Sequence, residues 1–409
     1  MANTSLRPAL LLALLCFVLA ALTGTLLRYG LLHGFPFDLH FVNVRHAHSH
    51  LMYFGWVTPA LFVLIAAAVQ RATDRPSRRG FGAAIWLTLA CAVIAYPPFF
   101  LSGYNLTQIG ELHLPLSMIA ASLNVLAWYA FVGVYLSHRV RLKGNLPLLC
   151  FDASLFLLVL SSLGAWGLAA AAFAPFASPD LMSLLVSFFL DLFSSGWFAL
   201  ALLGLLYGAL PAASHGGAAR IGLVLIVAGL LASAFGELLA VPAPVAAIGA
   251  AVAGVGLLTS AAVLGAAAVR QRAGALTFLA LLLAFLGAVE LARASPVVDR
   301  LMQLWGLEVF LLHGYLLGFV TLGLVALALR TFAPKGQASL WWMAAGAVLV
   351  LVSLVPLTAL WPPAWRGRWA LEFALWASVA PIVTAGAVWQ ALARQAGGSK
   401  TGGAHRPAP

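Results

Sequence analysis

Charged side chains are scarce in this sequence. Asp, Glu, Lys and Arg together make up 8% of its 409 residues, whereas soluble domains carry about 25%. A chain with so few charges is neither a water-soluble enzyme nor an intrinsically disordered protein. Cysteine is scarce too, since Cys16, Cys91 and Cys150 are the only three and lie far apart. Without a Cys-x-x-Cys or Cys-x-x-Cys-His motif, neither a disulfide framework nor a covalently attached c-type haem is indicated.

Apolar residues dominate instead, at 63% of the chain. They recur in runs of about 18 residues or more, which predicts an all-α, polytopic membrane helix bundle of about 12 transmembrane helices. The predicted spans are 9–28, 44–69, 81–101, 115–137, 148–173, 180–208, 219–240, 243–269, 275–293, 304–330, 339–361 and 369–393. The connections are too short for a soluble domain. We expect one membrane domain over residues 1–395 and a disordered cytoplasmic tail over 396–409, where Gly, Pro and Ser are frequent. No internal repeat is recognisable by eye.

The basic residues predict the orientation of the bundle. With the N-terminus inside, sixteen of the 22 Lys and Arg residues fall in cytoplasmic segments and six in outer segments, in agreement with the positive-inside rule. Both termini are then cytoplasmic, and we expect a multi-pass protein of a bacterial-type inner membrane. Because the basic residues are spread singly over loops, the net charge of +11 reflects this topology, and no nucleic-acid partner is expected.

Most titratable groups within the predicted spans lie in the outer half of the bundle. Ionisable groups inside a bilayer are costly and often functional. Asp191 is predicted near mid-membrane, whereas Glu237 and Glu308 lie toward the outer ends of their spans. Two roles are open for Asp191. One is a structural hydrogen bond, with Ser194 and Ser195 one turn away, and the other is proton movement.

Histidines concentrate at the start of the second span. His46, His48 and His50 fall within five residues, while His113 precedes the fourth span and His313 lies in the tenth. Neutral imidazole is a common ligand of iron, copper and zinc, and of haem in membranes. On a helix, positions four apart share a face and positions two apart do not. His46 and His50 therefore share one face while His48 points the other way, so the three cannot all bind one haem.

The residues around these histidines resemble a known family. The stretch Gly24-Thr-Leu-Leu-Arg28, followed by His46-Ala-His-Ser-His-Leu-Met-Tyr-Phe-Gly-Trp-Val-Thr-Pro59, is similar to the first two helices of haem–copper oxidase subunit I. In that family, a Gly-Thr…Arg ending of helix one precedes a helix-two histidine that binds the low-spin haem. The resemblance implies that His48 is this ligand and that its partner is the helix-ten histidine, His313. Twelve spans with both termini inside also match the family.

The sequence departs from the oxidases at their copper centre. The family places copper-ligand histidines in helices six and seven, where this chain has Asp191 and Glu237 and no histidine. The family's helix-ten His-x-His is reduced to His313-Gly-Tyr315. The resemblance therefore implies one bis-histidine haem without a copper centre, and it leaves turnover as an oxidoreductase open. A similar His-x-His and twelve-span plan occur in the NnrS family, haem- and copper-associated membrane proteins tied to nitric oxide responses.

The depth of the two implied haem ligands depends on where the tenth span begins. A start near Gln303 places His313 ~15 Å along its helix, whereas His48 lies ~6 Å into the second span. A start near Glu308 brings the two histidines to similar depths. His113 is the alternative partner for His48.

The first functional hypothesis is that His48 and His313 bind haem b. The protein would then bind a gas such as nitric oxide or dioxygen, or pass electrons to a redox partner, at the outer face. Arg28 and Arg45 are placed to neutralise haem propionates, or else they anchor lipid headgroups.

Two other function classes are open. One is a proton-coupled secondary transporter, because twelve spans are typical of permeases and Asp191 and Glu237 would carry protons. The other is a metal-binding assembly factor, in which the face shared by His46 and His50 holds copper or zinc. Under the haem hypothesis, His46, His50 and His113 form a second metal site or are partners of the propionates. The lipid bilayer is a partner in every case.

Overall fold

The computed structural model describes residues 4–73, 78–173, 178–211, 216–239 and 244–394. It is built almost entirely of helices, and twelve of its helical segments are long and apolar enough to cross a membrane. The expectation of an all-α, multi-pass membrane bundle is thereby confirmed. The predicted tail at 396–409 lies outside the described residues.

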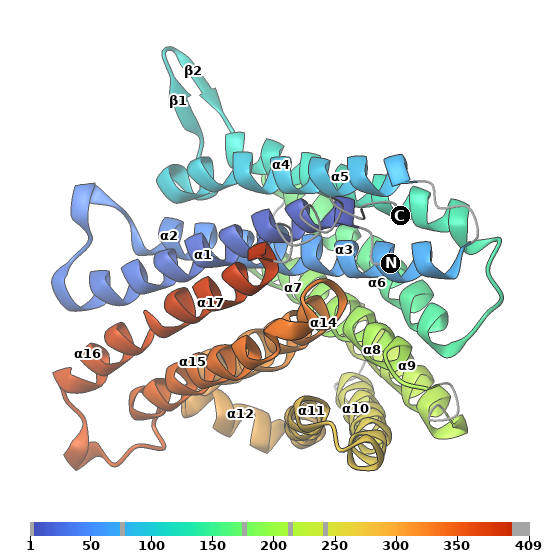
Figure 1. The fold of residues 1–409 in the computed structure, drawn as a ribbon. Coiled ribbons are helices and arrows are strands. Elements are labelled where there is room, and N and C mark those ends of the chain that lie inside the picture. The colour runs from blue at the N-terminus through green and yellow to red at the C-terminus, as the bar shows by residue number, and fades with distance from the viewer. Residues whose placement is uncertain (1–3, 74–77, 174–177, 212–215, 240–243, 395–409) are drawn as a thin grey trace, which may run out of the picture.

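The helices follow one another through the bundle as antiparallel spans (Figure 1). In chain order they are α1 (Arg7–His33), α2 (Phe41–His50), α3 (Thr58–Ala72), α4 (Arg78–Ser102), α5 (Leu116–Arg139), α6 (Leu146–Ala171), α7 (Pro179–Leu190), α8 (Ala199–Gly208), α9 (Gly217–Leu238), α10 (Pro244–Gln271), α11 (Gly274–Arg293), α12 (Pro296–Leu304), α13 (Glu308–His313), α14 (Leu322–Phe332), α15 (Ala338–Leu354), α16 (Arg368–Ala377) and α17 (Ala380–Arg394). Strands β1 (Thr107–Ile109) and β2 (Leu112–Leu114) form an antiparallel hairpin that projects from the end of α4. We call this end of the bundle the hairpin end; α1 ends there, and α2 and α13 begin there.

Three spans form the centre of the bundle. The second, sixth and tenth spans have 89%, 78% and 61% of their most apolar stretch buried, against 22–56% in the other spans. Each contains a π-helical segment, at Leu51–Val57, Asp191–Phe198 and Gly314–Thr321. Each segment includes a glycine followed by an aromatic residue, namely Gly55-Trp56, Gly196-Trp197 and Gly318-Phe319. The π-helical segments therefore recur in every fourth span, a periodicity that the sequence alone did not reveal.

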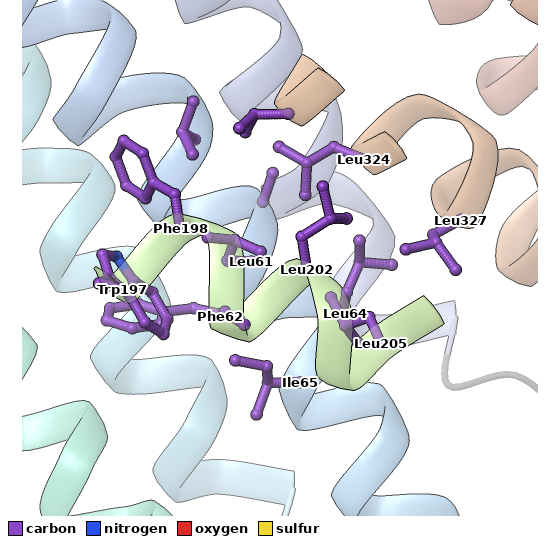
Figure 2. Packing of buried hydrophobic residues seen from close by; sticks show 14 of the residues in the cluster. Leu61, Phe62, Leu64, Ile65, Trp197, Phe198, Leu202, Leu205, Leu324 and Leu327 are labelled. Carbon is purple, nitrogen blue, oxygen red and sulfur yellow. The ribbon is translucent and has the colours of Figure 1, made fainter. Parts of the chain in front are cut away.

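Side-chain hydrogen bonds join the central spans at or beside these π-helical segments, one bond for each pair of spans. The bonds run from Trp56 Nε1 to Thr321 Oγ1 at 3.1 Å, from Trp197 Nε1 to Thr58 Oγ1 at 3.5 Å, and from the Tyr315 hydroxyl to the Ser194 carbonyl oxygen. Toward the opposite end, leucine and aromatic side chains of the same three spans fill the core (Figure 2). The bundle is thus held together along its axis by the spans that carry the π-helical segments.

Glycines allow α9, α10 and α11 to pack closely. A Cβ atom at Gly249 would lie 2.5 Å from the Ser233 backbone nitrogen, and one at Gly254 would lie 2.6 Å from the Leu291 backbone nitrogen. Only residues without side chains permit such backbone approaches. Gly249 and Gly254 of the eighth span therefore make contacts within one chain.

The tenth span begins later than the predicted 304. Residues 296–304 form α12 as a separate short helix, and Gly306 has a φ of +66°, which breaks the helical path. The membrane helix starts at Glu308. The later start places His313 less deep than the earlier alternative would.

Candidate functional site

A cavity of about 440 Å³ lies among α1, α2, α13, α15 and α17, toward the hairpin end. Small-molecule and cofactor sites usually occupy about 300–1,000 Å³. All four residues that the sequence singled out for a cofactor line this cavity, namely His48, His313, Arg28 and Arg45. They come from the first, second and tenth spans. The fold thus places His313 beside three residues of the first two spans.

The two histidines are held in matching hydrogen-bonding states. His48 Nδ1 lies 2.7 Å from the carbonyl oxygen of Ala20 on α1, and His313 Nδ1 lies 2.7 Å from the carbonyl oxygen of Val309. A carbonyl oxygen only accepts, so Nδ1 carries the hydrogen in both rings. A neutral imidazole then has its lone pair on Nε2. Metal-binding histidines in proteins commonly have this arrangement, with the second nitrogen oriented by a backbone or carboxylate acceptor.

The depths of the two histidines are compatible with one shared ligand. His48 is the eighth residue of α2 and His313 is the sixth of α13. At 1.5 Å per residue they lie ~10 Å and ~7.5 Å from the starts of their helices. With α2 beginning at Phe41 and α13 at Glu308, the two depths differ by ~3 Å, against the ~9 Å that starts at Val44 and Gln303 would give.

The cavity is positively charged. Arg28 Nη1 donates a hydrogen bond to the Gly24 carbonyl oxygen at 3.1 Å. Within the described part of the chain, neither Arg28 nor Arg45 forms a salt bridge, and no Asp or Glu lines the cavity. Two guanidinium groups without a protein counter-charge favour an anionic occupant.

The rest of the wall is mostly apolar. Phe17, Leu316, Leu317, Val350 and Leu354 are among its lining residues. Arg28 lies in the last turns of α1 and Arg45 in the first turns of α2, both at the hairpin end. Positive charge is therefore concentrated on one side of the cavity. The site therefore suits an amphipathic molecule with a flat or bulky apolar body and acidic groups at one edge.

His46 and His50 lie outside the cavity, in a cluster with Tyr104. His50 Nδ1 lies 2.9 Å from the His46 carbonyl oxygen, so His50 Nε2 accepts the Tyr104 hydroxyl at 3.0 Å. The His50 ring also stacks on Phe99, with ring centroids 3.8 Å apart. Both nitrogens of His50 are thus engaged.

The hairpin carries His113 away from the other histidines. His113 is in β2, pairs with Gln108 across the hairpin and is exposed. Across the residues that the structure describes, no group of three or more His, Cys, Asp or Glu side chains is arranged to hold a metal ion. The histidines that the sequence grouped as metal ligands therefore divide into the cavity pair, the pair beside Tyr104, and His113.

The acidic residues form a separate group between the sixth, seventh and ninth spans. Asp191 is within electrostatic range of Glu237, Glu290 and Arg293, and Arg293 pairs with Asp299 at 2.8 Å. None of these residues lines the cavity. Glu308 is exposed in the first turn of α13.

Tyr315 follows His313 by two residues and is not among the residues that line the cavity. Its hydroxyl donates to the Ser194 carbonyl oxygen in the sixth span. Tyr315 therefore stands where the His-x-His pattern has its second histidine, and its hydroxyl joins the tenth span to the sixth.

Sequence reasoning missed two features. Ser378 and Pro381 of the last span help to line the cavity, but apolar spans look alike in sequence, so no signal indicated which of them face the site. Asp152 accepts the Tyr135 hydroxyl at 2.7 Å and pairs with Arg139 at 2.9 Å, joining α5 and α6. The available signal was a carboxylate, Asp152, inside an apolar span that follows a loop with basic residues. No family model and no curated protein matches this chain.

Proposed function

We propose that the cavity binds one haem b between His48 and His313 and that the protein transfers electrons near the outer face of a bacterial-type inner membrane. One observation carries the proposal. Two histidines from different spans line one cavity, and each has its Nδ1 hydrogen bonded to a backbone carbonyl oxygen, which leaves the Nε2 lone pair available to a metal. Haem b bound there would supply a one-electron ferric–ferrous couple.

The charges of the cavity support the same occupant. Arg28 and Arg45 lack salt-bridge partners among the described side chains and lie at the hairpin end of the site. Guanidinium groups bind carboxylates well. They would hold the two propionates of haem b toward the hairpin end, while Phe17 and Leu317 contact its apolar edge. The hairpin end would then be the outer face, as the distribution of basic residues predicts.

Electron transfer is favoured over gas binding because the cavity provides two imidazole ligands. Haem iron held by two protein ligands has no free position for nitric oxide or dioxygen. A gas-binding role would require His48 or His313 to withdraw, and each is held by a 2.7 Å hydrogen bond to a helix carbonyl. The side chains of the site therefore act by holding and orienting the group.

The test is an absorption spectrum of the detergent-purified protein, oxidised and dithionite-reduced, with a pyridine haemochromogen assay to count haem. We expect about one haem per chain and sharp α and β bands on reduction. Carbon monoxide or nitric oxide should leave the reduced spectrum almost unchanged. A large carbon monoxide shift would assign a gas-binding role instead, and a colourless protein would overturn haem binding.

A second candidate is proton-coupled transport, which the group of Asp191, Glu237 and Glu290 favours. Proton uptake coupled to a solute by a colourless protein in proteoliposomes would support it, and loss of uptake in Asp191→Asn would assign the carboxylate. Stoichiometric copper without haem would instead support a metal-binding assembly factor.

A further inference from the structure

Three residues on one face of α1 contact the side chains of the site. Ala20, Gly24 and Arg28 are spaced four residues apart, so they form a stripe along the helix. The Ala20 carbonyl oxygen accepts from His48 Nδ1 at 2.7 Å, and the Gly24 carbonyl oxygen accepts from Arg28 Nη1 at 3.1 Å. The backbone of one helix therefore orients both an imidazole and a guanidinium of the cavity.

Gly24 lies between these two contacts, directly beside the His48 ring. A Cβ atom at Gly24 would lie 3.0 Å from His48 Cε1, 3.2 Å from His48 Nδ1 and 3.7 Å from Arg28 Nη1. The first two distances are closer than carbon and nitrogen atoms ordinarily pack, so a methyl group there would displace the imidazole. Displacement would lengthen the 2.7 Å bond to Ala20, because that bond involves the same Nδ1 atom.

Gly24 differs from the other crowded glycines of the chain in what surrounds it. At Gly249 and Gly254 the nearest atoms belong to the backbone of neighbouring helices, and at Gly30 they belong to the Phe35 ring. At Gly24 all three nearest atoms belong to His48 and Arg28. Close packing of helices explains Gly249 and Gly254, and contact with Phe35 explains Gly30. Gly24 instead leaves room for a side chain of the site.

We propose that Gly24 is a positioning residue of the cavity. By lacking a side chain, it lets the His48 imidazole lie against α1 in the orientation that directs Nε2 into the cavity, and its carbonyl oxygen holds Arg28. The inference rests on the proposed haem site, because the orientation of His48 matters only if Nε2 binds a ligand. The inference adds that α1, which supplies no ligand of its own, sets the orientation of the His48 ligand.

The test compares Gly24→Ala with two matched controls in the full chain. Gly30→Ala is in the same helix, and its Cβ would lie 2.2 Å from the Phe35 ring, so it perturbs α1 without touching His48. Gly133→Ala adds a methyl group in α5 where no atom lies within 4 Å. Two readouts are needed, the lowest-field g value of the ferric protein by electron paramagnetic resonance and the rate of haem loss to apomyoglobin.

We expect Gly24→Ala to retain haem but to shift the g value, since that value depends on the orientation of the axial imidazoles. Haem loss should be about 10- to 100-fold faster, the usual cost of disturbing a residue that orients a metal ligand. Both controls should keep the wild-type g value, even if Gly30→Ala lowers the yield. An unchanged g value and loss rate in Gly24→Ala would overturn the inference. A colourless wild-type protein would instead overturn the haem proposal itself.

Discussion

Trp56 Nε1 donates a hydrogen bond to Thr321 Oγ1 at 3.1 Å, and each partner lies eight residues after a cavity histidine. Trp56 follows His48 in the second span, and Thr321 follows His313 in the tenth. Each eight-residue stretch starts in α-helix and continues through a π-helical segment, so the two stretches advance by similar distances. The bond therefore holds two parallel segments in register and places both histidines at similar depth. This register explains how residues so distant in sequence come to line one cavity.

Removing the acceptor of this bond should weaken the bundle. In Thr321→Val the buried Trp56 indole loses its partner, and an unsatisfied buried donor costs about 1–3 kcal/mol. We expect a lower thermal midpoint of the detergent-solubilised protein and a shifted ferric g value. Trp56→Phe combined with Thr321→Val should recover part of the midpoint, because the unsatisfied donor is gone. If the double variant is as unstable as the sum of the single variants, the bond does not couple the two spans.

Both His48 and His313 should be required for the low-spin spectrum. His48→Ala and His313→Ala each remove one of the two proposed Nε2 ligands, so we expect loss of the sharp reduced α and β bands, with the purified protein still monodisperse on size exclusion. His113→Ala is the matched control, because His113 is exposed on the hairpin. A normal spectrum in His48→Ala would remove this residue from the site, whatever the other variants show.

Arg28 should contribute to retention of haem through its charge. Arg28→Leu removes a guanidinium that has no salt-bridge partner among the described residues, and a hydrogen bond to a charged group contributes about 1.5–3 kcal/mol. We expect roughly 10- to 100-fold faster haem loss. Arg366→Leu, on a loop outside the cavity, serves as the control. Equal loss rates in the two variants would show that Arg28 does not bind the propionates.

The fold class and the four cavity residues could be predicted from the sequence because both depend on local signals. Runs of apolar residues are recognisable without knowing the tertiary structure. His48, His313, Arg28 and Arg45 are conspicuous because polar groups are rare in such runs. Their meeting in one cavity could be expected only through the family resemblance, since nothing in the spacing of residues 28 to 313 determines it.

Features that depend on how the spans pack could not be predicted in this way. The π-helical segments lie at or beside hydrogen bonds between spans such as Trp56 to Thr321, whereas the sequence shows only a glycine beside an aromatic residue. The start of α13 depends on Gly306, whose positive φ separates α12 from the membrane helix. The role of Gly24 depends on which side chain of another helix comes to lie beside it.

The ion pair between α5 and α6 should matter more for stability than the ion pair near α12. Asp152 accepts from the fully buried Tyr135 at 2.7 Å and pairs with Arg139, so Asp152→Ala leaves the Tyr135 hydroxyl only a 3.5 Å bond to the Leu148 carbonyl oxygen and should cost about 1–3 kcal/mol. Asp299→Ala removes a more exposed pair with Arg293, for which about 0–1 kcal/mol is expected. Thermal unfolding in the same detergent compares the two. The haem spectrum should stay unchanged in both, because neither carboxylate lines the cavity. A larger loss in Asp299→Ala would mean that the group of charges near Asp191, and not the α5–α6 contact, stabilises the bundle.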